Sequence, residues 1–151
     1  MEVFLKQITL PEAHDVIDLF DQYRVFYKQR SDINLAKRFI TERLENHESI
    51  IFVAYNSDKP IGFTQLYPKY SSARATKNWI LNDLYVDENH RGKGVARALI
   101  KESMTFAKSS SAIFLQLETA FDNFSAQKLY EFIGFQKQAA DDTFFLYKIT
   151  V

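Results

Sequence analysis

The stretch Leu84-Tyr85-Val86-Asp87-Glu88-Asn89-His90-Arg91-Gly92-Lys93-Gly94-Val95-Ala96 is the most informative part of this chain. An apolar strand end runs into a short polar loop, and a turn with two of the chain's four glycines then opens an amphipathic helix. Glycine lets backbone N–H groups approach a ligand, and a helix start offers unpaired donors and partial positive charge. The stretch predicts a phosphate-binding turn. The alternative is a tight turn with solvated Arg91 and Lys93.

Composition narrows the class of protein. With 151 residues, 46% hydrophobic and 15% aromatic, the chain is expected to form one domain over residues 1–151 with a sizeable core. Its 19 basic and 19 acidic residues cancel, which argues against a nucleic-acid partner. Because there is no cysteine, disulfides, thiolate metal sites and a cysteine nucleophile are excluded.

Other signals bear on metal binding and location. The three histidines form no pair at ligand spacing, so no metal site is expected. Polar residues interrupt the apolar ones in the first ten positions, unlike a signal peptide, and no apolar run approaches the length of a membrane span. We therefore expect a cytoplasmic protein without a membrane partner.

The hydrophobic pattern predicts alternating elements and a mixed α/β fold. Helices are expected after Pro11, after a cap at Asp32 or Asn34, and from Val95 to about Ser109. A further helix should end at Gly134. The expected strands are 3–8, 49–55, 61–70, 79–86, 113–117 and 144–149, with a loop at 71–77 and the last strand paired with the segment after Phe135 across an Asp141-Asp142 turn. The result would be a sheet with helices on both faces.

A second segment, residues 123–135, follows a strand as the first does, and ligands of open α/β sheets bind where such junctions meet. Arg91-x-x-Gly94-x-Ala96 resembles the acetyl-CoA pyrophosphate motif of the GNAT superfamily of N-acetyltransferases. Asn123-x-x-Ala126-x-x-Leu129-Tyr130-x-x-x-Gly134-Phe135 is similar to that superfamily's second cofactor motif. The resemblance implies a GNAT-like, mixed but mostly antiparallel sheet flanked by helices on both faces.

The resemblance also implies a cosubstrate, acetyl-CoA, and residues that bind it. The helix start would hold the pyrophosphate through backbone amides, and Arg91 would add charge. The preceding strand would pair its backbone with the pantetheine arm and polarise the thioester carbonyl. Asn123 would hydrogen-bond the same arm. The implied cofactor-binding residues are Leu84, Tyr85, Val86, Arg91, Gly92, Lys93, Gly94, Val95, Ala96, Arg97 and Asn123.

Tyr130 is the expected general acid. Attack of an amine on a thioester expels a thiolate with a conjugate-acid pKa of about 8.5, and a phenol of pKa about 10 can protonate it. The alternative is a core aromatic beside Leu129 and Ile133.

The sequence leaves several candidates for the general base. Polyamine-type members of the superfamily often carry Glu where this chain has Asn82. Asp83, Glu118 or a water held by Asn82 could take that role, while Asp83 could instead pair with a nearby arginine. Glu118 could bind a cationic substrate. The segment of residues 67–72 is expected to form a wall of the acceptor site together with Tyr23, Phe26 and Tyr27; the alternative is that each aromatic is an ordinary packing residue.

Two classes of function remain. The first is an enzyme that acetylates a primary amine of a small molecule, such as a polyamine or an amino acid, in a ternary complex; a protein-lysine or N-terminal acetyltransferase is a variant of it. The second is a CoA-binding sensor or partner subunit without catalysis. Relatives of this kind are commonly dimers, so a homodimer is expected.

Overall fold

A computed structural model describes residues 1–138 and 144–151 of the chain. The described chain divides into two compact units, Met1–Glu118 and Thr119–Val151. The first carries the sheet and the predicted phosphate-binding turn, and the second carries the predicted second motif.

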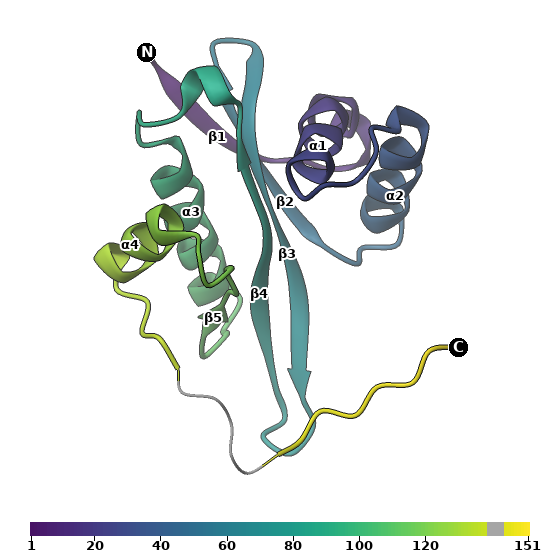
Figure 1. The fold of residues 1–151 in the computed structure, drawn as a ribbon, viewed down its shortest axis with the longest axis vertical. Helices are drawn as coiled ribbons and strands as arrows, with labels where there is room; N and C mark the ends of the chain where they lie inside the picture. The colour runs from purple at the N-terminus through teal and green to yellow at the C-terminus, as the bar shows by residue number, and fades with distance from the viewer. Residues whose placement is uncertain (139–143) are drawn as a thin grey trace. The chain divides into compact units, whose positions relative to one another are not determined.

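The first unit is built on one sheet with the strand order β1-β2-β3-β4-β5 (Figure 1). Neighbouring strands are antiparallel except for β4 and β5, which are parallel. The predicted mixed, mostly antiparallel sheet is therefore confirmed. The strands are β1 (Val3–Gln7), β2 (Ile50–Asn56), β3 (Lys59–Ser71), β4 (Thr76–Val86) and β5 (Leu115–Gln116).

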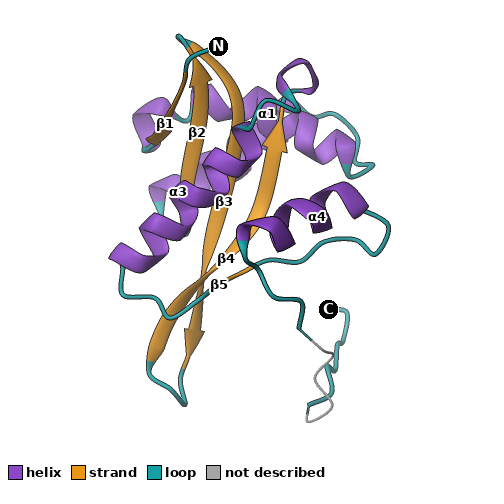
Figure 2. Cartoon of the chain, turned by 90° about the vertical axis from the view of Figure 1, so that its left-hand side faces the viewer, coloured by secondary structure: helices purple, strands orange, loops and turns teal. Residues whose placement is uncertain are grey.

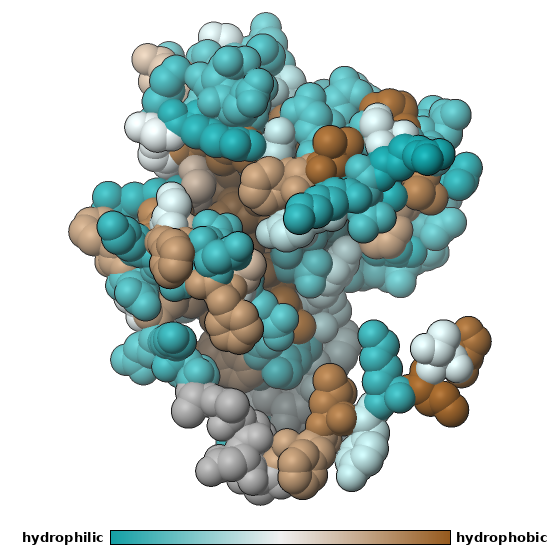
Figure 3. Space-filling view, viewed as in Figure 1, coloured by the Kyte–Doolittle hydropathy of each residue, from teal (hydrophilic) through white to brown (hydrophobic). Residues whose placement is uncertain are grey.

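Helices cover both faces of this sheet, as predicted. Helices α1 (His14–Phe26) and α2 (Ile33–Glu45) lie on one face, and α3 (Val95–Ser109) crosses the other (Figures 1 and 2). Two short 3₁₀ turns, η1 (Leu10–Glu12) and η2 (Glu88–His90), precede α1 and α3. The outward surface over α1 and α2 is largely hydrophilic (Figure 3).

The core follows from the predicted apolar faces. Under α1 and α2, one cluster joins helix residues to the inner face of the sheet, among them Val16, Phe20, Ile40, Val53 and Phe63. Under α3, Leu99 and Ile100 are fully buried, and the ring of Phe106 packs edge-on against Trp79 and Phe52. Burial of this apolar surface is the main stabilising contribution to the sheet and its helices.

The link between α1 and α2 is fixed by a buried carboxylate. Asp21 is 5% exposed and accepts hydrogen bonds from the Ser31 hydroxyl at 2.6 Å and the Asp32 N–H at 2.8 Å. Asp32 in turn caps α2 by accepting from the Leu35 N–H at 3.0 Å. Of the two caps left open by the sequence, the structure selects Asp32.

The expected loop at 71–77 is shorter than predicted. Ser71 pairs with Thr76, so β3 and β4 form a long hairpin whose turn comprises only residues 72–75. Ala75 takes a positive φ of 52° and donates to the Ser72 carbonyl, which closes the turn. The prediction missed this because Arg74 and its neighbours show no glycine or proline signal.

The expected strand 113–117 is reduced to Leu115–Gln116. The Ile113 and Phe114 N–H groups both donate to the side-chain oxygen of Asn78, at 2.8 and 3.3 Å, instead of to a neighbouring strand. Ile113 is 70% exposed, so this segment is not the doubly covered strand that its apolar run predicted.

The second unit contains α4 (Phe124–Ile133), as predicted. Gly134 ends the helix with a φ of +120°. The predicted strand 144–149 is wrong, because these residues have no regular secondary structure. An alternating pattern forms a strand only where another backbone pairs with it, and a lone two-stranded ribbon is marginal in water. The Asp141-Asp142 turn lies outside the described residues.

Candidate active site

The two glycines lie in the turn before α3, where the sequence predicted a phosphate-binding turn. Gly92 and Gly94 have φ angles of +73° and +84°, a region that side chains with a Cβ rarely adopt. Gly94 is the N-cap of α3, and no side chain caps the helix there. A Cβ built on either glycine would meet no atom within 4 Å. The first amides of α3 therefore face a space that an anionic group can enter.

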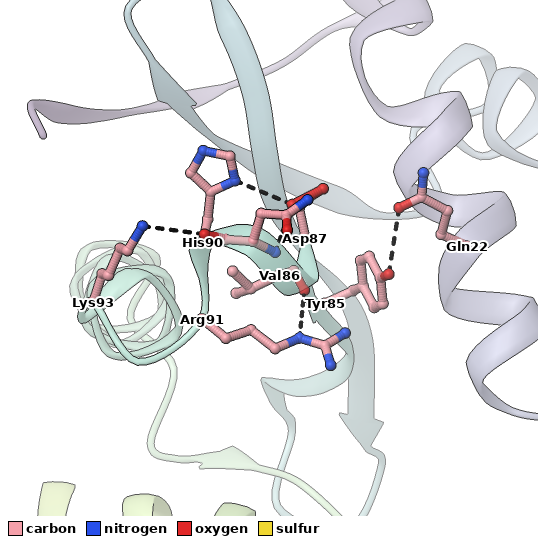
Figure 4. A network of polar contacts seen from close by, with 8 residues as sticks. Gln22, Tyr85, Val86, Asp87, His90, Arg91 and Lys93 are labelled. Carbon is pink, nitrogen blue, oxygen red and sulfur yellow. Dashed lines mark hydrogen bonds and ion pairs between the residues drawn. The ribbon is translucent and has the colours of Figure 1, made fainter.

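Side chains in the preceding loop hold this turn in place (Figure 4). The Asp87 carboxylate accepts from the Asn89 N–H at 2.9 Å and lies 3.1 Å from His90 Nδ1. Partial burial opposes ionisation of Asp87, but the hydrogen bonds from His90 and Asn89 outweigh it and lower the pKa of the carboxyl. The Lys93 ammonium donates to the Asn89 carbonyl at 3.1 Å.

Arg91 connects the turn to β4 and to α1. Its Nε donates to the Val86 carbonyl at 2.8 Å, and its guanidinium lies 5.3 Å from the ring centre of Tyr85 and 5.9 Å from that of Phe26. The Tyr85 hydroxyl donates to Gln22 of α1 at 3.3 Å (Figure 4). We call the turn with Gly92 and Gly94 and the first amides of α3 the cradle. One hydrogen bond and two aromatic rings thus hold the Arg91 guanidinium beside the cradle.

Strand β4 offers one edge for pairing near this turn. On one side it pairs with β3 along its whole length, whereas β5 pairs only with Trp79 and Ile80 on the other. Among the described strands, none pairs with that second edge between Leu81 and Val86. This is the segment whose backbone was predicted to bind an extended ligand arm.

A β-bulge interrupts β4 at Asn82. Gln65 lies opposite Asp83 and Leu66 lies opposite Leu81, so Asn82 is an extra residue on β4. Bulges redirect side chains and are frequent next to active sites. Here the bulge leaves Asn82 exposed and turns Asp83 into the protein, where it is 3% exposed.

The Asp83 carboxylate lies under α1 within a set of polar donors. Gln65 Nε2 donates to Oδ2 in a short hydrogen bond, and Asn82 Nδ2 donates to Oδ1 at 2.9 Å. The Tyr23 hydroxyl lies beside the carboxylate and donates to the Asn82 carbonyl at 3.5 Å. Burial raises the pKa of Asp83, and the hydrogen bonds from Gln65 and Asn82, together with the nearby Tyr23 hydroxyl, only partly offset that effect. Such a carboxylate accepts a proton more readily than an exposed one.

Two tyrosines face the same carboxylate. Burial, together with the negative charge of Asp83, raises the pKa of both Tyr23 and Tyr67 well above the usual range of a phenol. Both hydroxyls therefore stay neutral at physiological pH. The Tyr23 ring packs against the Tyr27 ring, with a centroid distance of 4.9 Å. The result is an aromatic surface with a buried negative charge at its base.

Known proteins resemble this chain in sequence and in fold. A family model described as Acetyltransferase (GNAT) family matches residues 13–135. The chain is 41% identical to the uncharacterised N-acetyltransferase YhfO of Bacillus subtilis (strain 168), over 133 residues that cover 88% of this chain and 89% of the relative.

The chain belongs to the GNAT acetyltransferase family. Among solved structures, a probable acetyltransferase is similar with a TM-score of 0.86 and 35% identity, covering 100% of this chain and 98% of the other. A ribosomal-protein-alanine N-acetyltransferase from Brucella melitensis biovar Abortus 2308 has a TM-score of 0.76 and 25% identity, with 99% of each chain covered. The family uses acetyl-CoA, so this GNAT chain is an acetyl-CoA-dependent acetyltransferase.

The cradle of this GNAT domain fits the pyrophosphate of acetyl-CoA. Its open amides, the two left-handed glycines and the adjacent Arg91 supply donors and positive charge without a side chain in the way. Of the other residues expected in this site, Val95 is 2% exposed and belongs to the core, whereas Ala96 is partly buried and Arg97 is exposed on the first turn of α3.

The remaining site residues of the first unit lie in different surroundings. Tyr27 is the C-cap of α1 and 55% exposed. Glu118 is exposed after β5, at the end of the first unit. The expectation that Asp83 pairs with an arginine is wrong: its partners are uncharged amides and a phenol, because the bulge directs it toward β3 and α1.

Two predicted residues belong to the second unit. Asn123 is the N-cap of α4, where its Oδ1 accepts from the Ala126 N–H at 3.2 Å. Tyr130 is partly buried, and its ring packs edge-on against Phe135 at 6.1 Å. Within the described residues of the chain, no group of three or more histidines, cysteines or carboxylates could hold a metal ion, and no helix is long and apolar enough to span a membrane.

Sequence reasoning missed Gln65 and Ser49. Both are buried, and the Ser49 hydroxyl donates to Gln65 Oε1 at 2.8 Å. The available signal was weak: Phe63, Gln65 and Tyr67 alternate along one strand and so share a face. A glutamine on the apolar face of a central strand needs a buried polar partner.

Proposed function

We propose that this acetyltransferase transfers the acetyl group to a primary amine of a small molecule, such as a polyamine or an amino acid, by direct attack in a ternary complex. The observation that supports the proposal is the Asp83 carboxylate, buried in contact with Tyr23 and facing Tyr67. A negative charge beside aromatic faces attracts an alkylammonium ion through charge and cation–π interactions.

Asp83 serves in this proposal as the general base. An alkylammonium with a pKa of about 10.4 must lose a proton before its nitrogen can attack. A carboxylate has roughly four acceptor positions, and the Gln65 and Asn82 amides each donate to one of its oxygens. A substrate N–H can take a remaining position and pass its proton to the carboxylate, whose raised pKa favours that transfer.

The cofactor residues act on acetyl-CoA, which supplies the acetyl group as a thioester. The amides from Gly92 to Arg97 bind the pyrophosphate, with charge from Arg91. The backbone of Leu84, Tyr85 and Val86 binds the pantetheine arm and polarises the carbonyl. Asn123 hydrogen-bonds the arm. The Tyr130 hydroxyl gives its proton to the departing sulfur.

A panel of amine acceptors tests the proposal. CoA release is measured with polyamines, amino acids, a peptide with an N-terminal alanine and a peptide with an internal lysine. We expect the highest kcat/KM with a small amine, and a loss of roughly 10²-fold or more in kcat for Asp83→Asn. If Glu118→Gln lowers kcat to this extent and Asp83→Asn does not, Glu118 is the general base. If only Asn82→Ala does so, the base is a water held by Asn82.

A second candidate acceptor is the N-terminus of a protein. It is favoured by the similarity to a ribosomal-protein-alanine acetyltransferase. Higher kcat/KM with the N-terminal alanine peptide would select it. Binding of acetyl-CoA without turnover on any acceptor would instead indicate a CoA sensor or a partner subunit.

We also propose that residues 1–151 act as one acetyltransferase domain, since the family match runs through both compact units. A cytoplasmic homodimer is the proposed state. Light scattering of the purified protein tests the dimer, and fractionation of cells tests the location.

A further inference from the structure

The polar side chains behind Asp83 form a chain that reaches away from the aromatic surface. Ser49, immediately before β2, donates through its hydroxyl to Gln65 Oε1 at 2.8 Å. Gln65 Nε2 then donates to Asp83 Oδ2. The exposed fractions of these three side chains are 6%, 0% and 3%. Buried polar groups of this kind are costly unless each one is satisfied.

We propose that Gln65, oriented by Ser49, is a positioning residue that holds the Asp83 carboxylate in its reactive orientation and sets the pH at which it ionises. This inference rests on the proposed base role of Asp83. It adds two residues, one from β3 and one immediately before β2, that contact neither the proposed acceptor nor acetyl-CoA.

The chemistry of the amide dictates the direction of this chain. If the Gln65 amide were reversed, its carbonyl oxygen would face the carboxylate oxygen, and two acceptors would be in contact. An ionised carboxylate can only accept, so it favours the orientation in which Nε2 faces Asp83. The Ser49 hydroxyl then donates to Oε1 and holds the amide in place, and the amide N–H stabilises the ionised form of the carboxyl.

The surroundings of Asp83 contain few other charges that could produce the same effect. Tyr23 faces it from α1 and Tyr67 from β3, while Tyr27, the C-cap of α1, acts on Tyr23. Arg43 of α2 and Glu48, in the turn that follows α2, act on Tyr67 with opposite signs. The Tyr23 and Tyr67 phenols are neutral across the pH range in which a carboxyl titrates, because their pKa values are raised.

Titration of the Asp83 carboxyl by ¹³C NMR tests the inference without any substrate. The Asp83 signal is assigned by its loss in Asp83→Asn. In Gln65→Leu we expect the midpoint to rise by about one to two pH units, because a hydrogen bond to the charged form is lost. Ser49→Ala should move it in the same direction by less. Thr64→Val is the matched control, because Thr64 is equally buried on β3 but donates to the backbone carbonyl of Asp83 at 2.8 Å.

The outcomes separate the two proposals. An unchanged midpoint in Gln65→Leu, or an equal shift in Thr64→Val, overturns the positioning role whatever the activity. If Gln65→Leu does not fold, the test rests on Ser49→Ala. An unchanged titration midpoint of Asp83 in that variant overturns the positioning role. A shifted midpoint supports the positioning role. If the acidic limb of kcat/KM against pH then fails to move by the same amount, Asp83 is not the base, and the proposed mechanism fails instead.

Discussion

Gly62 of β3 lies in close contact with Tyr85 of β4. A Cβ built on Gly62 would stand 3.0 Å from the Tyr85 carbonyl oxygen and 3.4 Å from side-chain atoms of Val86 and Val95. Strand β4 and Val95, the first residue of α3, therefore pack so closely against Gly62 that a larger residue would force a shift. The separation between β3 and the cofactor-side strand is set at this point.

Gly62→Ala should consequently affect both stability and cofactor binding. The backbone carbonyl of Tyr85 cannot move aside as a flexible side chain could, so β4 must shift by a few tenths of an ångström. We expect a loss of about 1–3 kcal/mol in the free energy of unfolding and weaker binding of acetyl-CoA, measured by urea unfolding and by calorimetry. Unchanged values in both would mean that this contact does not constrain the strands.

Gly94→Glu should abolish binding of acetyl-CoA, which we expect at one molecule per protomer. The new side chain fills the open space before α3 and places a negative charge where the pyrophosphate is proposed to bind. Gly94→Ala separates strain from charge and should retain weak binding, because the left-handed φ is strained for alanine but no charge is added. Thr105→Glu adds the same charge to an exposed position of α3 and should bind normally. Normal binding by Gly94→Glu in calorimetry would rule out this cradle.

Transfer should proceed through a ternary complex, because the chain has no cysteine to carry an acetyl group. Initial rates measured against acetyl-CoA at several acceptor concentrations should give intersecting lines in double-reciprocal plots. Parallel lines, or a covalent acetyl-enzyme that forms and decays at the rate of turnover, would contradict direct transfer.

Tyr130→Phe should lower the rate of acetyl transfer by roughly 10²-fold or more, the scale of a lost general acid. Affinity for acetyl-CoA should change little, because the ring and its edge-on contact with Phe135 remain. Single-turnover transfer at saturating acetyl-CoA is the measurement, since it removes product release from the rate. Tyr70→Phe removes a hydroxyl from an exposed tyrosine and serves as the control. A near-normal rate for Tyr130→Phe would leave Tyr130 as a packing residue.

The buried carboxyl predicts how stability changes with pH. Because the pKa of Asp83 is raised in the folded state, the folded protein binds this proton more tightly than the unfolded chain does. Its contribution to stability is therefore present at low pH and lost as the pH rises above about 4, the usual pKa of an exposed aspartate.

Urea unfolding of wild type and Asp83→Asn over a pH series checks this sign. The stability of the wild type should fall relative to the variant as the pH rises. Glu12 acts oppositely: a hydrogen bond from Lys6 and others from Thr9 lower its pKa to about 2. Its contribution is common to both proteins and cancels in the difference. The quantity compared is the free energy of unfolding of the wild type minus that of Asp83→Asn. If it stays constant or increases as the pH rises, the pKa of Asp83 is not raised.

Local patterns were sufficient for much of the fold and for the cradle. Paired glycines after an apolar strand predicted the turn before α3, where Gly92 and Gly94 are left-handed, and the choice of Asp32 or Asn34 as the cap of α2 included the residue that caps it, Asp32. These features depend on residues within one or two turns of one another. The resemblance to the GNAT family, carried by the two motifs, gave the fold class that the comparisons confirm.

Features that depend on distant residues could not be predicted. The surroundings of Asp83 bring together Gln65, 18 residues away, and Tyr23 of α1, and they require a bulge that has no glycine or proline signal. In the same way, Asn78 captures the N–H groups of Ile113 and Phe114 from 35 and 36 residues away and so shortens β5. Such polar contacts arise from tertiary packing, which period and propensity do not encode.

The last two turns of α1 touch both halves of the proposed chemistry. Tyr23 reaches the Asn82 carbonyl at 3.5 Å and the Asp83 carboxylate, whereas Gln22 and Phe26 contact Tyr85 and Arg91 beside the cradle. The end of α1 therefore contacts residues of both the proposed acceptor site and the proposed cofactor site. Thermodynamic linkage makes any effect of one site on the other reciprocal: whatever factor acetyl-CoA imposes through α1 on the affinity for the amine, the amine imposes on the affinity for acetyl-CoA. A single helical segment that reacts with neither substrate can thus make each one change the affinity for the other.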